Sequence, residues 1–90
     1  MVTVTLYGPV REVVGEKTLS ARGETVGAVL ESLFAERPEL EARMMSDDGA
    51  GFRHQVQVFV DGRKLGTLDG LETALSGEET VQVTAAMSGG

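Results

Sequence analysis

The chain has no cysteine, a single histidine and few aromatic residues, and these absences exclude most internal active sites. Without cysteine there is no disulfide framework, no thiolate nucleophile and no cysteine-ligated zinc site. His54 cannot build a multi-histidine metal site, and no Gly-x-Ser-x-Gly motif accompanies it to indicate a serine-based triad. We interpret His54 as a surface residue just before a strand, because a lone histidine specifies little. The sequence therefore predicts a protein that is not itself an enzyme.

Basic charge and long apolar runs are also scarce. The 90 residues carry 14 acidic and 8 basic side chains, a formal net charge of −6, which repels phosphate backbones and argues against a nucleic-acid partner. The same charge favours steered encounter with a basic protein surface. No stretch approaches the roughly 18 apolar residues of a membrane span, and the opening residues are typical of a strand, not of a signal peptide. We expect a cytoplasmic protein without membrane association.

No motif indicates a bound metal or a phosphate loop. Asp47-Asp48-Gly49 lacks the ligand spacing of a calcium loop and is better interpreted as a solvated turn. The glycines at positions 49 and 51 do not open a helix after a strand, as a phosphate-binding loop requires. We therefore expect no metal and no permanently bound cofactor.

Alternating apolar residues predict the strands. In the first of them, Val2, Val4 and Leu6 alternate with polar or aromatic residues, which is typical of a half-buried strand. The third is followed by Asp61-Gly62, a strong tight-turn signal. Strands are expected over residues 2–7, 18–21, 55–60 and 80–85.

One amphipathic helix is expected between the second and third strands. Its apolar residues recur at spacings of three and four and form a single stripe. They are Val26, Val29, Leu30, Leu33 and Phe34. Thr25 stands where a capping side chain belongs, and Pro38 ends the helix because the residue before a proline is pushed out of the α region. Shorter helical turns are expected after Pro9 and around Leu40.

These elements predict a β-grasp fold of the α+β class. The helix must bury its stripe, and a mixed sheet of four to five strands supplies one apolar face to cover it. The first and last strands fit side by side in the middle of that sheet. We expect one domain over residues 1–85 and a flexible functional tail over residues 86–90, which carry no charged side chain.

The tail is the remaining place for chemistry. Gly89 and Gly90 have no side chain, so the backbone can thread a narrow channel with the carboxylate of Gly90 at its tip. A partner enzyme that transfers an adenylyl group from ATP would turn this carboxylate into a mixed anhydride. A sulfur donor would then give a thiocarboxylate, and an amine would give an amide. On its own the glycine pair is typical of a frayed terminus. Its place after the strand and helix order of a β-grasp fold, in a chain without an internal active site, favours a functional tail.

Several short segments resemble one known family: the ubiquitin-like sulfur carriers typified by the small subunit of molybdopterin synthase. The archaeal ubiquitin-like small modifier proteins belong with it. The segments span nearly the whole chain, and their order and spacing together carry the resemblance. They are VTLYGPVRE (4–12), TVGAVL (25–30), RPEL (37–40), VFVDG (58–62), GEETV (77–81) and SGG (88–90).

The resemblance implies a pathway for the tail. Gly90 would be adenylated by a ubiquitin-activating-type adenylyltransferase, which uses ATP, and a sulfurtransferase would supply the sulfur of the thiocarboxylate. The large subunit of molybdopterin synthase would then receive the tail, with Met87, Ser88 and Gly89 threading its channel, in molybdenum cofactor biosynthesis. Archaeal relatives would instead, or also, join the same glycine to lysines of target proteins.

The resemblance also implies an apolar docking patch on the outer face of the sheet. Tyr7 and Phe59 are the candidates, because each alternates away from the valine and leucine face of its strand. The alternative is that both pack locally under the short connecting elements.

Three functions therefore stay open at the level of sequence. The favoured one is a sulfur carrier for molybdopterin or a related thiolation pathway. The second is a protein modifier that forms isopeptide bonds through Gly90, and the two roles can coexist. The third is a β-grasp binding module with an inert tail.

Overall fold

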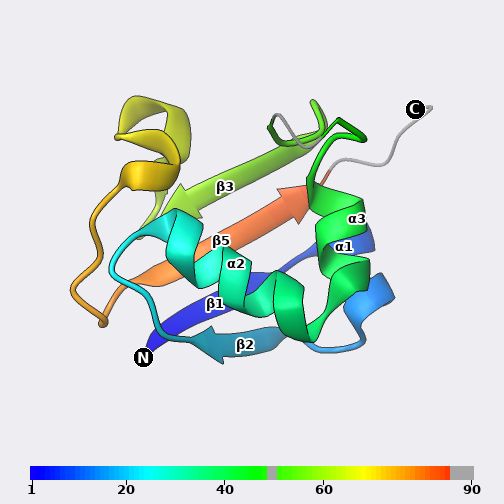
Figure 1. Ribbon diagram of the computed structural model, residues 1–90, viewed down its shortest axis with the longest axis horizontal. Coiled ribbons are helices and arrows are strands. Elements are labelled where there is room, and N and C mark those ends of the chain that lie inside the picture. Colours follow the sequence, from blue (N-terminus) through cyan, green and yellow to red (C-terminus); the bar gives the residue numbers. More distant parts are fainter. Residues whose placement is uncertain (49–50, 86–90) are drawn as a thin grey trace.

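The fold is a single sheet with helices packed on one side (Figure 1), and the computed structural model describes residues 1–48 and 51–85. Within these residues the sheet has five strands in the order β2-β1-β5-β3-β4. They are β1 (Val2–Leu6), β2 (Thr18–Ala21), β3 (Val56–Val60), β4 (Arg63–Lys64) and β5 (Thr80–Ala85). β1 and β5 run parallel, and every other neighbouring pair is antiparallel. The first and last strands are therefore adjacent at the centre of a mixed sheet, as predicted.

The structure contains the predicted amphipathic helix and adds a second helix directly after it. They are α1 (Gly8–Val14), α2 (Val26–Glu36) and α3 (Pro38–Met44), with short 3₁₀ turns η1 (Leu65–Thr67) and η2 (Gly70–Glu72). Thr25 caps α2, since its Oγ1 accepts a hydrogen bond from the Ala28 N–H at 3.1 Å. Pro38 ends α2 and also begins α3, because a proline is well suited to the first turn of a helix. None of the helices in the described ranges is long and apolar enough to cross a membrane.

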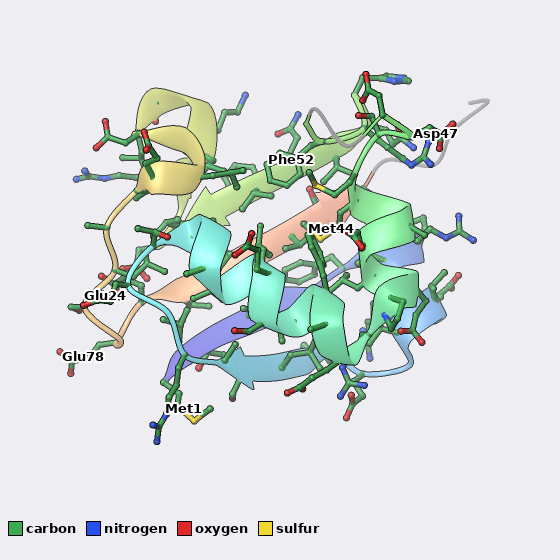
Figure 2. All side chains as sticks on the ribbon, in the orientation of Figure 1. Met1, Glu24, Met44, Asp47, Phe52 and Glu78 are labelled. Carbon is green, nitrogen blue, oxygen red and sulfur yellow. The ribbon has the colours of Figure 1, made fainter. Side chains whose placement is uncertain are left out.

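The core lies between α2 and the sheet. Val4, Leu6, Val81 and Val83 are fully buried on the inner face of the two central strands. Four residues of the predicted stripe are buried against them, whereas Phe34 lies at the margin of the core. α3 adds Leu40 and Met44, and Figure 2 shows Met44 pointing from α3 toward the sheet. Burial of this apolar area is the main stabilising term of so small a domain.

The Asp61-Gly62 turn joins β3 to β4 and also fixes the start of β5. Both turn residues have positive φ, 49° and 86°, which is the conformation that a two-residue hairpin requires. The Asp61 N–H donates to the Thr80 carbonyl at 2.9 Å, and Asp61 Oδ1 accepts from the Thr80 N–H at 3.0 Å. The turn thereby fixes where the last strand enters the sheet.

Candidate functional site

β5 is the strand that leads to the tail, and it is bonded on both sides. It pairs with β1 as far as Leu6↔Val83 and with β3 as far as Val56↔Ala85. The Tyr7 N–H adds a hydrogen bond of 3.0 Å to the Val83 carbonyl. Ala85 therefore ends a firmly held strand. The predicted tail residues Met87, Ser88, Gly89 and Gly90 lie outside the described residues, so their roles stay predictions.

Gly8 lies against the end of β5, a contact that the sequence analysis missed. Its φ is +64°, a conformation that residues with a side chain rarely adopt, and a Cβ there would stand 3.1 Å from the Ala85 carbonyl oxygen. The turn from β1 into α1 thus passes close beside the last residue of β5. A glycine between a strand and a proline was the available signal, because such a position often needs a left-handed backbone.

Tyr7 and Phe59 lie together on the outer face of the sheet. Both line a shallow hollow of about 370 Å³, together with Gly62, Gln82 and Thr84. Tyr7 is 38% exposed and Phe59 is half-buried, so neither is hidden under the connecting elements. The sheet therefore brings the two predicted residues into one surface, while their role in docking stays a prediction.

Gln82 and Thr84 were not singled out from the sequence, yet they form the floor of this hollow. They alternate with Val81 and Val83, so a period of two already places them on the face opposite the core. Phe59 is directly opposite Gln82 in the β3–β5 register, which brings an aromatic ring beside an amide. The lining carries amide, hydroxyl and aromatic groups, which suit recognition of a protein surface.

His54 and the Asp47-Asp48 pair lie away from this hollow. His54 is exposed in the turn before β3, as predicted. Asp47 Oδ1 accepts a hydrogen bond from Arg53 Nη2 at 2.9 Å, and the Arg53 Nε donates to the Ala42 carbonyl at 3.1 Å. The turn is therefore tied to α3, and within residues 1–48 and 51–85 there is no cluster of three or more potential metal ligands.

One carboxylate has a strongly altered acidity, and it organises the entry into β5. Glu79 accepts hydrogen bonds from the backbone N–H groups of Ser76 and Gly77, at distances from 2.9 to 3.1 Å. These bonds, the Ser76 N–H first among them, lower the pKa of Glu79 from 4.5 to about 2. The ionised carboxylate thus holds the Ser76-Gly77 turn that delivers the chain into the sheet.

Comparison with known proteins places the chain among ubiquitin-like carriers. The ThiS family matches residues 4–90. Small archaeal modifier protein 3 of Haloferax volcanii is 38% identical over 87 residues, which are 93% of this chain and 92% of that protein. The sulfur carrier protein CysO of Mycobacterium tuberculosis is 32% identical over 77 residues, which are 84% of this chain and 83% of that protein.

A solved structure agrees with the fold and topology. The small archaeal modifier protein 1 of Methanosarcina acetivorans superposes with a TM-score of 0.83 at 29% identity, over 99% of this chain and 95% of that one. The β-grasp prediction is thereby confirmed. The chain belongs to the ThiS family, and it is a ubiquitin-like protein of the sulfur-carrier and small-modifier kind, not an enzyme.

Proposed function

We propose that the chain carries sulfur as a thiocarboxylate on Gly90, for molybdopterin synthesis or a related thiolation pathway. The observation that carries the proposal is the extent of the family match, which runs from residue 4 through Gly89 and Gly90. The mycobacterial relative, named a sulfur carrier, supports it. The double pairing of β5 adds a physical reason, since a tail that follows Ala85 has a rigid base from which to reach into a partner.

The chemistry proceeds in two steps on the active site of a partner. A carboxylate oxygen of Gly90 attacks the α-phosphorus of ATP, and the bond to the pyrophosphate oxygen breaks, which gives an acyl adenylate. Hydrosulfide then attacks the carbonyl carbon, the bond to the AMP oxygen breaks, and loss of a proton leaves the thiocarboxylate. A sulfurtransferase that delivers the sulfur as a persulfide needs a thiol reductant in addition. Gly89 keeps the path to the reacting carbon free of side chains.

The hollow between Tyr7 and Phe59 is the proposed docking surface for the activating adenylyltransferase. Aromatic side chains give large contact area with few rotatable bonds, and they are common anchors of protein interfaces. Gln82 and Thr84, in the same hollow, offer an amide and a hydroxyl for hydrogen bonds to the enzyme. Thr84 immediately precedes Ala85, so an enzyme bound here has the base of the tail at its surface.

Conjugation to proteins is a second candidate function. The Haloferax relative is named a small archaeal modifier protein, and it is 38% identical to this chain. The same adenylate serves this reaction, because the ε-amine of a target lysine attacks the carbonyl carbon of Gly90 and AMP leaves. The two functions differ only in the nucleophile of the second step.

Intact mass spectrometry after incubation with a ubiquitin-activating-type enzyme of the same organism, ATP and sulfide tests the main proposal. We expect a product that is heavier by the difference between sulfur and oxygen, with the change located at Gly90. A variant without Gly89 and Gly90 should give no product while keeping the same thermal unfolding midpoint. Absence of product from the natural chain, with an enzyme proven active on another carrier, would contradict the thiocarboxylate. Isopeptide-linked adducts that depend on Gly90 would then favour the modifier function.

Matched surface variants test the docking part separately. Tyr7→Ser and Phe59→Ser should each slow the loading of Gly90 by about tenfold, as expected for an interface anchor. Leu71→Ser is the control, because Leu71 is 41% exposed, comparable to Tyr7 at 38%, but lies next to α2 on the helix side. An equal loss with all three variants would place docking elsewhere, even if thiocarboxylate formation itself is observed.

A further inference from the structure

The β3 edge of the sheet is only partly covered. β4 pairs with Phe59 and Val60, and this pairing ends at Phe59↔Lys64. β3 pairs with β5 from Val56 to Val60, so Val56, Gln57 and Val58 have a neighbouring strand on the β5 side alone. The peptide groups of alternate residues in a strand point to opposite edges, and a strand edge that is left open is a template for another strand.

Alternation along β3 determines which groups face this edge. The Asp61 N–H bonds to Thr80, so the peptide groups of Asp61 point toward β5. Those of Val60 point toward its hairpin partner Arg63. Two residues earlier, the peptide groups of Val58 share the direction of Val60 and face the open edge. An extended segment beside Val58 can therefore continue the line of β4.

An apolar groove of about 440 Å³ lies beside this edge, on the helix side of the sheet. Val58 and Leu65 are buried at its base, and Met45, Phe52 and Leu71 line it from three other segments. Figure 2 shows Phe52 next to β3. The groove is thus distinct from the hollow of Tyr7 and Phe59, with which it shares no lining residue.

The charge at one end of the groove is positive. Lys64 is the single charged residue among its described lining. Neither Lys64 nor its neighbour Arg63 takes part in an ion pair within the described part of the chain. Both are exposed on a protein whose net charge is −6, so this end is a local cationic site on an otherwise acidic molecule.

We propose that this edge groove binds an extended segment of a partner protein by strand addition to β3. The segment carries an acidic residue beside Lys64 and alternating aliphatic residues that enter the groove. The stretch from Val56 to Val58 spans about 10 Å at roughly 3.3 Å per residue, which accommodates two groove-facing side chains. The Val56 N–H already donates to the Arg53 carbonyl at 2.9 Å, so the added strand pairs with Val58. The main chain supplies the hydrogen bonds, and the groove and Lys64 supply the selectivity.

Two other occupants fit less well. A second copy of the chain would bring two molecules of net charge −6 together over a three-residue edge, which is far less than a stable interface needs. The chain's own residues 86–90 offer Lys64 only the terminal carboxylate of Gly90, and the residues next to it, Ser88 and Gly89, supply no aliphatic side chain for the groove. The proposal goes beyond the carrier function, since it needs no reaction at Gly90.

A titration of the ¹⁵N-labelled full chain with the peptide acetyl-Asp-Glu-Val-Thr-Val-Thr-amide tests the proposal. We expect amide shifts at Val58, Lys64, Leu65 and Gly66, and none at Tyr7 or Thr84. A peptide with proline in place of the first threonine should not bind, because proline lacks the N–H for the ladder and restricts the strand. A peptide with two lysines in place of the acidic pair should bind about tenfold more weakly. Absence of shifts at millimolar peptide, or shifts centred on Tyr7, would overturn the proposal.

Variants of the chain complete the test. Lys64→Glu should weaken peptide binding about tenfold, whereas Lys17→Glu, at the opposite edge of the sheet, should leave it unchanged. Leu71→Ser should weaken peptide binding, and Tyr7→Ser should leave it unchanged. For the loading of Gly90 by the activating enzyme, the expected effects of these two variants are reversed. Equal effects of the two lysine variants would indicate general charge attraction and overturn the site. Tighter binding after deletion of residues 86–90, or self-association at the same amides without peptide, would assign the groove to the chain itself.

Discussion

Leu6 and Tyr7 are neighbours in the chain, yet they belong to opposite faces of the sheet. Leu6 is 0% exposed in the core, whereas Tyr7 is 38% exposed on the outer face. The same alternation separates Val83 from Gln82 and Thr84 on β5. One face of the central strands therefore holds the fold together, and the other is free to contact a partner. The comparison shows how so small a chain can change its recognition surface without changing its core.

The separation is less strict at the β3 edge. There the helix side also carries exposed apolar surface, because Leu71 is exposed and Met45 and Phe52 are only half-buried around the groove. Leu71 is as exposed as Tyr7, although it packs its backbone against Gly27 of α2. Exposed apolar residues on both sides thus mark surfaces that a partner can cover.

The largest expected effect is the loss of stability on truncating the inner face. Leu6→Ala should lower the free energy of unfolding by about 2–5 kcal/mol, because it removes buried contacts and leaves a cavity. Tyr7→Ser should lower it by about 1 kcal/mol or less, since surface substitutions cost little. Urea unfolding followed by circular dichroism measures both. Similar losses for the two variants would mean that Tyr7 is structural, and the division between the faces would fail.

The elements of both faces could be predicted because their signals are local. The alternation of Val2, Val4 and Leu6 and the stripe of α2 each lie within one segment, and each appears in the structure as predicted. The topology followed from the need to cover one helix with one sheet. The family resemblance then located the tail chemistry, which no buried cluster or periodicity could have indicated.

What sequence reasoning missed depends on contacts between distant segments. The groove gathers residues from before β3, from β3 itself and from the 3₁₀ turns, and no spacing along the chain connects them. The two-residue strand β4 is too short to give a period. The expected turn near Leu40 is a complete helix, because Pro38 starts α3 directly after α2 and Leu40 and Met44 are buried in the core.

A smaller loss of stability is expected on substitution of Gly8, which lies beside the last residue of β5. Gly8→Ala should cost about 1–2 kcal/mol, because alanine is disfavoured at a φ of +64°. The new Cβ would also press on the Ala85 carbonyl, 3.1 Å away, so the amide signals near the end of β5 should shift. Thermal unfolding should show a midpoint lower by about 4–8 °C for each kcal/mol.

Gly66→Ala is the control for this position. A Cβ at Gly66 meets nothing within 4 Å and its φ is not positive, so the midpoint should change little. If both alanine variants lower the midpoint equally, the left-handed turn at Gly8 is not the cause. If Gly8→Ala slows the loading of Gly90 at a temperature at which the variant is fully folded, the turn also sets the direction of the tail.

The smallest change in stability is expected on substitution of Glu79, and it is recognised by its dependence on pH. Its pKa is lowered to about 2 in the folded chain by hydrogen bonds from Ser76 and Gly77, so the ionised carboxylate favours folding. This contribution is complete at pH values above 4.5, the ordinary pKa, and is lost as the pH falls from there toward 2. Glu79→Gln should therefore be less stable than the natural chain at neutral pH, and the difference should narrow in acid.

Urea unfolding at pH 7, 4 and 3 measures this narrowing, with Glu78→Gln as the control. Glu78 is exposed beside Glu79, and the Ser76 and Gly77 N–H groups bond to Glu79 instead, so the Glu78 variant tests the removal of one neighbouring charge without loss of these bonds. A constant difference between Glu79→Gln and the natural chain would mean that the side chain acts by its shape and not by its charge. A stability difference that narrows in acid would show that the charge of Glu79 holds the Ser76-Gly77 turn. The start of β5 would then be stabilised by charge, whereas its interior is stabilised by burial of one face.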